Sequence, residues 1–571
     1  MNGGAHMRLL IDEKSITPQP GQTLLDLVRI LGLDDTSLAR KPLAAKIAGE
    51  VFNLNYIPLR DKDMTPERPS IRTAMAAANG NVQLLRYEDP TGRDVYARPA
   101  QFVLFLSIHQ LWPNADAKVG TTVGPGLSVD VQGCNFSWQA LKEKVEQIVE
   151  LDIPLIRHRI STQQAIEKYA ANGQLDKARL LRWRDSPTFD LYEYGDFGEY
   201  YYGELAPSTG YLMVWDIVPT EDGFMFLFPD DFTPDKVACY KPMPNFFHVS
   251  NRAKQWCRLM ACQTVADLND LVESDGIREL IRVNEALLEN QFSQVANRVC
   301  QQGAQAVFLA GPSSSGKTTS ANRLSTQLRV HGKKPVLMSL DDYYIDRERI
   351  PFGPDGKRDL EHINTIDTEL FCQHLSLLLD GKEVEIPFFN FKTGCREYRG
   401  HKLRLNQDSV IIAEGLHALN PVLVPEELDK NRIFKLYVSP LLPLNLDNHN
   451  RIPSSYLRLL RRIVRDYETR GASVQETMAM WNSVRRGEQK WIYPFQEQAD
   501  WILNSSTLYE LAVLKKHIYP LLQAITPDEA CYEQVRAAVK VLNYVLEADV
   551  DDEIPPTSLV REFIGGNSYY K

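Results

Sequence analysis

The sequence lacks any apolar run long enough to cross a membrane. Over its 571 residues, no uninterrupted apolar stretch reaches the ~20 residues that a transmembrane helix needs. The first stretch, MNGGAHMRLLIDEKS, has no basic start followed by an apolar segment, so we expect no secretory signal there. Internal repeats and low-complexity tracts are also absent. These absences favour a cytoplasmic protein that has no contact with a membrane.

Cysteine is scarce and scattered. The chain holds eight cysteines, and Cys257 and Cys262 come closest to a metal-binding motif. No second cysteine pair and no histidine pair accompanies them, although zinc sites need such ligands at defined spacing. A chain of this length can bury a large core and does not need disulfides for stability. We therefore interpret the cysteines as buried or solvated thiols in a reducing cytoplasm.

An excess of positive charge is also missing. The chain has 64 Lys and Arg against 74 Asp and Glu, a formal net charge of -10. The charge balance gives no whole-chain electrostatic reason to expect nucleic-acid binding, and it disfavours RNA contact without excluding a local basic patch. Residues 522–571 are the more acidic part, with nine Asp and Glu against four Lys and Arg. The hydrophobic fraction of 44% is ordinary for a globular protein.

The length predicts several domains, because one hydrophobic core rarely serves more than about 250–300 residues. Residues 7–65 read as a small mixed module, and the Pro-rich stretch at residues 64–70 marks a boundary. Residues 75–235 mix helices and strands, whereas residues 250–302 look helical throughout. The individual elements expected in the first two regions are a strand at Met7–Asp12, a helix starting at Thr23, short strands within Ala45–Leu59, a helix at Trp138–Leu151, and strands at Tyr211–Ile217 and Gly223–Leu227.

From Ala306 onward, apolar strand candidates alternate with helical segments. This alternation is typical of a parallel sheet with crossover helices on its faces. The tail adds one helix, expected at Asp528–Glu547. The strand candidates of the sheet are Ala306–Ala310, Pro335–Leu340, Ser409–Ala413, Ile433–Val438 and Trp501–Leu503.

A glycine-rich loop lies directly between the first of these strands and a helix. Its glycines allow consecutive N–H groups to face phosphate oxygens at the positive end of the helix. In this pattern Lys317 can reach the β- and γ-phosphates, and the Thr318 hydroxyl can ligate Mg²⁺. The strand before and the helix after make a chance match improbable. The loop reads Gly311, Pro312, Ser313, Ser314, Ser315, Gly316, Lys317, Thr318 and Thr319.

Two carboxylate positions and one basic helix complete the candidate site. Glu414 ends the strand at Ser409–Ala413, where it could hold Mg²⁺ or its water. Asp341 and Asp342 follow the strand at Pro335–Leu340, and either could accept a proton or sit in a solvated turn. The segment 458–471 places arginines three or four residues apart on one helix face. That face is either a solvated surface or a cationic lid over a transferring phosphoryl group.

Residues 305–510 resemble the uridine kinase branch of the phosphoribulokinase/uridine kinase family. The resemblance implies transfer of the γ-phosphoryl group of ATP or GTP, with Mg²⁺, to the 5′-hydroxyl of a nucleoside. It implies that Asp341 is the general base, that Lys317, Arg465 and Arg470 act on the phosphates, and that Tyr344, Phe389, Phe391 and Arg396 surround the acceptor. The matching pieces are GPSSSGKTT, LDDYY, VEIPFFNFKTGCR (384–396), IIAEGLHAL (411–419), RRIVRDYETRG (461–471) and QADWILNSS (498–506).

The chain departs from this family where the nucleobase is read. Gly394 stands where uridine kinases carry a base-reading His, and Met480 and Ala472 replace a lid Gln and a lid Arg. Hydrogen-bonding groups supply much of a site's discrimination between substrates. The identity of the acceptor therefore stays open. It is either a uridine-like nucleoside or another hydroxyl compound, such as a phosphorylated sugar or an unusual nucleoside.

The front of the chain resembles two parts of threonyl-tRNA synthetase. Residues 7–65 are similar to its TGS module, a β-grasp fold. Residues 75–235 are similar to its editing domain, most clearly in YEYGDFGEYYYGELAPSTG (192–210). The family's HxxxH and Cys…His pairs correspond to Arg98, Phe102, Tyr201 and Leu205, none of which can ligate a metal or hydrolyse an ester in that role. The resemblance therefore implies that hydrolysis of aminoacyl-tRNA is lost.

The expected architecture is multidomain, with a P-loop α/β kinase behind a β-grasp module and an α+β domain. The main hypothesis is a kinase, with a small-molecule acceptor and a homo-oligomeric assembly as its partners. The alternative is an RNA-binding or regulatory protein that uses the kinase as a nucleotide-dependent switch. The expected domains are a TGS-like module (1–70), an inactive editing-like domain (71–240), a helical connector (241–302), the kinase (303–525) and a helical acidic tail (526–571).

Overall fold

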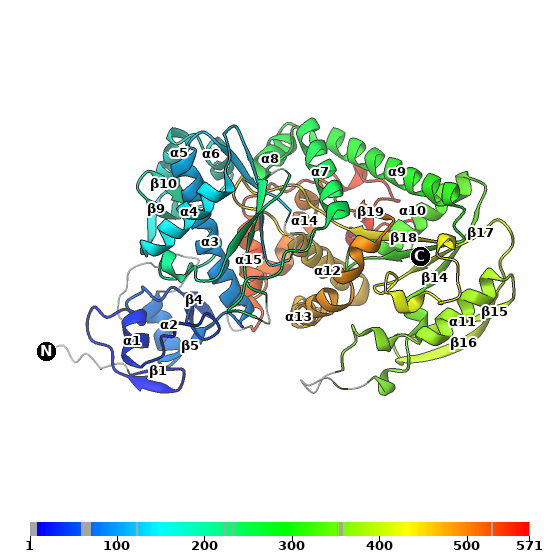
Figure 1. The fold of residues 1–571 in the computed structure, drawn as a ribbon, viewed down its shortest axis with the longest axis horizontal. Coiled ribbons are helices and arrows are strands. Elements are labelled where there is room, and N and C mark those ends of the chain that lie inside the picture. Colours follow the sequence, from blue (N-terminus) through cyan, green and yellow to red (C-terminus); the bar gives the residue numbers. More distant parts are fainter. Residues whose placement is uncertain are drawn as a thin grey trace.

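The computed structural model describes residues 8–58, 70–121, 124–221, 223–230, 233–350, 352, 358–526 and 529–569. Residue 7 and most of the Pro-rich stretch at 64–70 lie outside the described residues. In Figure 1, a small N-terminal module (blue) lies beside a second unit (cyan), and green helices lead to an α/β unit. The C-terminal helices (orange to red) return to the middle, between the two halves of the chain. None of the helices in the described part combines the length and the apolarity that crossing a membrane requires.

The N-terminal module is a five-stranded mixed sheet with the order β2-β1-β5-β3-β4. Thr23 caps the first helix and forms a capping box with Asp26, which explains why the helix begins there. Strand β5 pairs with both β1 and β3, so the module continues to Leu85 and the boundary expected at residue 70 is wrong. The elements are β1 (Leu9–Ile11), β2 (Lys14–Ile16), α1 (Leu24–Ile30), β3 (Ala44–Ile47), β4 (Glu50–Phe52), α2 (Ile71–Ala77) and β5 (Asn81–Leu85).

The second unit packs a long buried helix, α3 (Pro90–Leu111), against two small antiparallel sheets. Of the strand expected at Tyr211–Ile217, only Asp216 and Ile217 lie in a strand, and the rest of the prediction is wrong. Residues Thr209–Tyr211 form a 3-10 turn instead, because the Thr209 hydroxyl donates to Ile148 O at 2.8 Å and anchors the chain to α4. The other elements are β6 (Asp116–Val119), β7 (Gly126–Gln132), α4 (Trp138–Glu150), β8 (Arg157–Ser161), α5 (Thr162–Ala171), α6 (Leu175–Leu181), β9 (Thr188–Tyr194), β10 (Phe197–Glu199), β11 (Asp216–Pro219) and β12 (Gly223–Leu227).

The expected helical stretch before the kinase consists of three helices. They are α7 (Pro244–Leu259), α8 (Val265–Glu273) and α9 (Ile277–Gln302). Helix α9 ends at Gly303, whose φ of 70° is a left-handed conformation that favours glycine. The chain then enters the central strand of the α/β unit.

The α/β unit is built on a five-stranded sheet with the order β14-β17-β13-β18-β19, in which every neighbouring pair is parallel. The predicted parallel sheet is therefore confirmed. Strand β13 lies in its centre, which places the glycine-rich loop at the middle of the carboxyl edge. The elements are β13 (Ala306–Ala310), α10 (Lys317–Val330), β14 (Lys334–Ser339), α11 (Thr368–Leu379), β17 (Ser409–Glu414), β18 (Ile433–Ser439) and β19 (Trp501–Asn504), with an antiparallel hairpin of β15 (Val384–Asn390) and β16 (Cys395–Leu403).

The C-terminal residues do not form a separate acidic tail, so that expectation is wrong. Tyr544, Val560 and Phe563 are buried in a core that they share with residues of the second unit, the connecting helices and the α/β unit. The expected helix at Asp528–Glu547 begins at a residue outside the described ones, and within the described part it is confined to α15. The C-terminal helices are α12 (Ser454–Arg470), α13 (Val474–Trp491), α14 (Glu510–Gln523), α15 (Tyr532–Leu542) and α16 (Arg561–Ile564).

A loop of the α/β unit, residues 445–451, is inserted into the second unit, and we call it the docking loop. The His449 ring stacks on Phe105 of α3 at a centroid distance of 3.7 Å. Lys177 and Asp447, both fully buried, come within 3.7 Å of each other. The Asn448 carbonyl also accepts a hydrogen bond from the Val119 N–H at 2.8 Å. Because the loop leads directly into α12, the second unit helps to fix the position of that helix.

Candidate active site

The glycine-rich loop has the geometry of an anion site. At Gly311 a Cβ would lie 2.2 Å from the Val438 carbonyl oxygen, so only glycine fits there. Gly316 has a φ of 82°, which turns the chain into α10. In the described part of the chain, the N–H groups of Gly316, Lys317 and Thr318 have no protein acceptor. These unsatisfied donors at a helix N-terminus fit phosphate oxygens.

The loop serines add further donors. The hydroxyls of Ser314 and Ser315 are buried and have no hydrogen-bond partner among the described residues. Unpartnered buried polar atoms are rare in native proteins and call for a ligand or water. The N–H of Ser313 is instead used within the protein, since it donates to Glu488 Oε1 at 3.0 Å.

Lys317 lies among carboxylates at the floor of this site. Its ammonium donates to the Pro312 carbonyl at 3.1 Å. Burial lowers the pKa of Lys317, whereas the nearby carboxylates of Glu414 and Asp341 raise it. The ammonium is thus held next to the loop, where it can neutralise a phosphate.

The side chains of Thr318 and Glu414 place two oxygen atoms close together. The Thr318 hydroxyl donates to Glu414 Oε1 at 3.3 Å. Burial, and then the charge of Asp341, raises the pKa of Glu414 to about 7. A hydroxyl and a carboxylate are ligands that suit Mg²⁺, which takes its remaining ligands from phosphate and water. No group of three or more His, Cys, Asp or Glu able to hold a metal occurs among the described residues.

Asp341 and Asp342 diverge after strand β14. Burial raises the pKa of Asp341, while the Lys317 charge and a hydrogen bond from Tyr344 lower it. The Asp342 carboxylate accepts the N–H of Phe389 at 3.2 Å and so supports the β15–β16 hairpin. The two neighbours therefore have different surroundings, and Asp341 is the one that faces Lys317.

The arginines of α12 divide into two groups. Arg458 and Arg461 are fully buried, and they donate to the carbonyls of Ser313 at 3.0 Å and Ser314 at 3.3 Å. Their charges are balanced by buried carboxylates, since Arg458 pairs with Glu488 and Arg461 with Glu510. These two arginines hold the loop in place from behind. The sequence alone gave no signal to separate them from the arginines that face the site.

Arg465 and Arg470 share a different carboxylate. Arg465 Nη2 lies 2.9 Å and Arg470 Nη1 3.4 Å from Asp466 Oδ1. The charge of Arg465 acts on Lys317, and that of Arg470 acts on Asp341. Both guanidinium groups are therefore close to the predicted site of phosphoryl transfer.

Three of the four predicted acceptor residues form one aromatic cluster. The ring centroids of Tyr344 and Phe389 are 5.5 Å apart, and those of Phe389 and Phe391 are 5.1 Å apart. Phe391 is exposed, which leaves a ring face open beside Tyr344. The fourth residue, Arg396, differs from them because its guanidinium pairs with Asp367 at 2.8 Å and helps to hold the hairpin.

The three positions expected to depart from the base-reading pattern lie on different elements. Gly394 has a φ of 72° in the hairpin turn, and a Cβ there would lie 3.0 Å from the Cβ of Arg347. A histidine is therefore strained at this position. Met480 is exposed on α13, and Ala472 follows the end of α12.

A C-terminal carboxylate also reaches the glycine-rich loop, which sequence reasoning missed. Glu562 Oε2 accepts hydrogen bonds from the Thr319 hydroxyl at 2.6 Å and from the Thr319 N–H at 3.3 Å. Asn567 Nδ2 donates to the same hydroxyl at 3.2 Å. Thr319 continues the series of N–H groups that suits phosphate, so Glu562 occupies a position that an anion would otherwise take.

In the second unit, the four positions expected to replace editing residues are buried or half-buried. Phe102 and Leu205 are fully buried, and the buried Tyr201 hydroxyl has no partner among the described residues. Arg98 donates to the Glu204 carbonyl at 2.8 Å. Phe102 and Leu205 belong to the core of this unit and Tyr201 packs against it, and none of the four side chains is a His or a Cys.

Comparisons with known proteins match the α/β unit. The model of the phosphoribulokinase/uridine kinase family matches residues 307–511. The uridine kinase of Ligilactobacillus salivarius is 30% identical over 208 residues, which are 36% of this chain and 88% of that protein. The uridine kinase of Halobacterium salinarum is 28% identical over 199 residues, 35% of this chain and 79% of that protein. A solved structure from Bacillus stearothermophilus, described as a possible uridine kinase, is 19% identical with a TM-score of 0.24 and covers 35% of this chain and 89% of its own.

Proposed function

Because the chain belongs to the phosphoribulokinase/uridine kinase family, we propose that its α/β unit is a nucleoside kinase. It transfers the γ-phosphoryl group of ATP or GTP to the 5′-hydroxyl of a uridine-like nucleoside. The observation that carries the proposal is the meeting of three features at one sheet edge. These are the free N–H groups of the loop, the Asp341 carboxylate beside Lys317, and the open aromatic cluster.

The roles of the residues follow from their surroundings. Asp341 accepts the proton of the acceptor hydroxyl while the new O–P bond forms and the bond to the leaving diphosphate breaks. Lys317, Arg465 and Arg470 neutralise charge on the transferring phosphoryl group and hold the reactants in line. Thr318 and Glu414 would hold Mg²⁺, which supplies charge neutralisation to the phosphates.

The acceptor site suits a planar base that stacks on aromatic rings and is not held by a fixed hydrogen bond from the protein. Tyr344 and Phe391 offer ring faces, whereas Gly394 offers no side chain to read the base edge. This combination favours a nucleoside, with loose selection among bases. A phosphorylated sugar is the alternative acceptor, since the same phosphoryl-transfer residues would serve it.

The test is a screen of acceptors with the purified chain. We expect ADP release that depends on a nucleoside, and a product phosphorylated at the 5′-position by mass spectrometry and phosphorus NMR. Release that depends only on sugar phosphates would select the alternative acceptor. No acceptor-dependent release from any nucleoside or sugar, at Mg²⁺ and ATP concentrations that saturate related kinases, would reject the kinase proposal.

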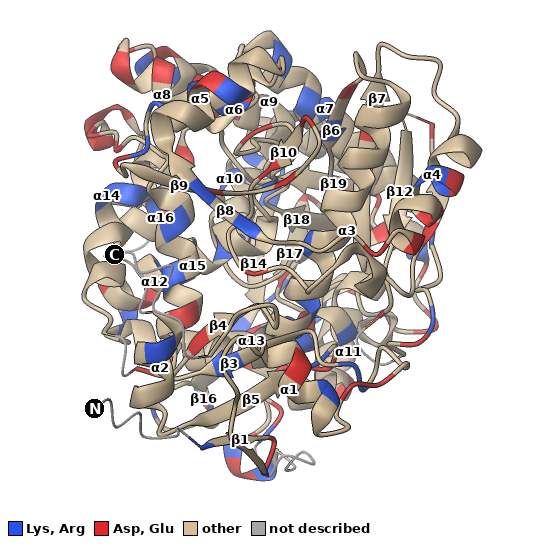
Figure 2. Cartoon of the chain, turned by 90° about the vertical axis from the view of Figure 1, so that its left-hand side faces the viewer, with Lys and Arg blue, Asp and Glu red and all other residues tan. Residues whose placement is uncertain are grey.

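We also propose identities for the front half of the chain. The mixed sheet of residues 9–85 supports a TGS-like β-grasp module, and the packed interior around Phe102 supports an editing-like domain without hydrolytic activity. Figure 2, which views this side, has basic and acidic segments interspersed, so its charge gives no support to RNA binding. The alternative is a regulatory protein in which nucleotide binding to the α/β unit acts on the front half. In that case the docking loop, which links the front half to α12, would carry the change. A cytoplasmic location and a homo-oligomer stay predictions.

We expect Glu562→Gln to lower the KM for ATP by about three- to tenfold. The carboxylate lies where an anion would bind, and two unit charges at ~4 Å repel by ~1 kcal/mol even in a water-like dielectric. Initial rates at varied ATP measure this effect. The matched control is Glu553→Gln, in the same segment, because Glu553 pairs with Arg278 and Arg282 away from the loop. An unchanged KM in Glu562→Gln, or an equal fall in both variants, would contradict the expectation.

A further inference from the structure

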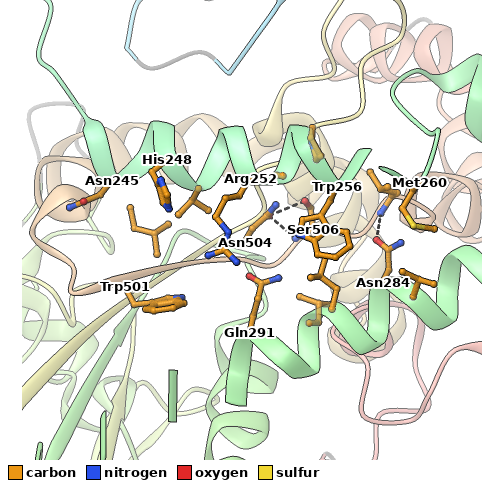
Figure 3. Close-up of a pocket in the computed structure, with 18 of the residues that line it drawn as sticks. Asn245, His248, Arg252, Trp256, Met260, Asn284, Gln291, Trp501, Asn504 and Ser506 are labelled. Carbon is orange, nitrogen blue, oxygen red and sulfur yellow. Dashed lines mark hydrogen bonds between the residues drawn. The ribbon is translucent and has the colours of Figure 1, made fainter. Parts of the chain in front are cut away.

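A cavity of about 190 Å³ lies between α7, α9 and the edge strand β19 (Figure 3). Trp256 from α7 and Trp501 from β19 line it, so an indole ring is available on each of two different elements. None of the residues proposed for phosphoryl transfer lines this cavity. It is therefore a feature that the kinase reaction does not explain.

Polar side chains inside the cavity are free to bind a ligand. Figure 3 shows Arg252 of α7 and Gln291 of α9 pointing toward one another across the space. Neither side chain has a hydrogen-bond or ion-pair partner among the described residues. Together they present the five N–H donors of a guanidinium and both a donor and an acceptor from an amide.

Two neighbouring amides that line the cavity are held in place by contrast. Asn504 accepts the Leu441 N–H at 2.8 Å and donates to the Leu441 carbonyl at 3.1 Å. Asn284 accepts the Leu508 N–H at 3.1 Å and donates to the Leu280 carbonyl at 2.8 Å. These two amides are fully engaged, so they shape the cavity while Arg252 and Gln291 remain available. Fixed amides beside free donors are expected in a largely pre-formed small-molecule site, which has a few polar groups to orient the ligand.

The lining selects the chemical class of the ligand. Indole faces favour planar aromatic rings, and a guanidinium donates in a fork to two adjacent acceptors, as it does to the O6 and N7 atoms of guanine. The volume is below the ~300 Å³ at which drug-sized ligand pockets begin, so the ligand has one or two rings. We propose that the cavity is a second small-molecule site, which binds a carbonyl-bearing nitrogen heteroaromatic of nucleobase size.

The test is direct binding to the full-length chain, with uracil and hypoxanthine as probes in isothermal titration calorimetry. We expect saturable binding that weakens about 10- to 100-fold in Arg252→Ala, because a hydrogen bond from a charged donor is lost. Gln291→Ala should weaken it as well. Arg252 is exposed on a helix, so alanine there should leave the fold intact, which the melting temperature checks. Arg298→Ala is the matched control, since Arg298 is exposed on α9 and does not line the cavity.

Two further experiments sharpen the test. One distinguishes binding at the cavity from binding at the acceptor site, and the other compares a free base with its nucleoside. Binding at the cavity should persist in Phe391→Ala, and quenching of tryptophan fluorescence by the probe should fall in Trp256→Phe. Uridine should bind the cavity more weakly than uracil, because the volume leaves little room for a ribose. The proposal is overturned if neither probe binds saturably up to ~10 mM, if Arg252→Ala binds as the wild type does, or if Phe391→Ala abolishes the binding. The kinase proposal stands or falls separately, by the acceptor screen.

Discussion

Replacing Lys317 with alanine should lower kcat/KM by about 10³-fold. A preorganised donor or cation aimed at developing charge typically contributes 10²–10³-fold in rate, and a cation on a transferring phosphoryl group contributes 10³–10⁵-fold. Lys317 is the cation held next to the loop, where it faces Glu414 and Asp341. Steady-state rates of acceptor-dependent ADP release measure the loss.

The fold should tolerate this change. The Lys317 ammonium makes a single hydrogen bond within the protein, to the Pro312 carbonyl, and the buried carboxylates beside it, whose pKa values burial already raises, can take up a proton when its charge is removed. We expect a melting temperature within a few degrees of the wild type. Lys334→Ala is the matched control, since Lys334 begins β14 at the amino edge of the same sheet and is exposed. Near-normal turnover in Lys317→Ala would refute the assignment of the loop to phosphoryl transfer.

The strands of the kinase sheet could be predicted from sequence because they carry a strong local signal. Strands β13, β17 and β18 are almost continuously buried, so their sequences are apolar runs bounded by turns. Strand β16, by contrast, was not predicted. Nearly all of its residues are exposed or half-buried and many are charged, so nothing in the run CREYRGHKL marks a strand. It is a strand because β15 pairs with it.

The parts of the site that were missed depend on contacts between distant residues. Glu562 and Thr319 are separated by 243 positions, and a carboxylate in an acidic segment carries no sign of its partner. The docking loop was missed for the same reason. Its sequence LDNHN (446–450) is typical of a solvated turn, although Asp447 is fully buried. Its partner Lys177 belongs to another unit. Buried charges of this kind persist only when paired, and sequence patterns do not report the pairing.

The basic helix shows the same limit in a single element. The spacing of the arginines in the sequence correctly places Arg458, Arg461 and Arg465 on neighbouring turns of a helix. It does not indicate which of these side chains are buried. The structure buries the first two against Glu488 and Glu510. Only the packing of α13 and α14 against α12 decides this outcome. The division between arginines that hold the loop and arginines that face the site therefore requires the tertiary structure.

Replacing Asp341 with asparagine should lower kcat by about 10²–10⁴-fold, the usual contribution of a general base. Asparagine keeps the size of the side chain but cannot accept the acceptor's proton. The Asp341 carboxylate interacts with the Lys317 charge and accepts a hydrogen bond from Tyr344, so it is held between the loop and the aromatic cluster. The KM for ATP should barely change, because Lys317, Thr318 and the loop backbone remain in place.

The neighbouring residue supplies the control for this prediction. Asp342 accepts the N–H of Phe389 and supports the hairpin, so Asp342→Asn should keep kcat within about tenfold of the wild type. A larger effect of Asp341→Asn than of Asp342→Asn, at equal melting temperatures, identifies the base. Equal losses in the two variants would leave the base unassigned, since both would then act through the shape of the site. If Asp341→Asn kept full activity on the true acceptor, proton transfer to Asp341 would have to be abandoned, and positioning by Lys317 and the arginines would have to account for the whole rate.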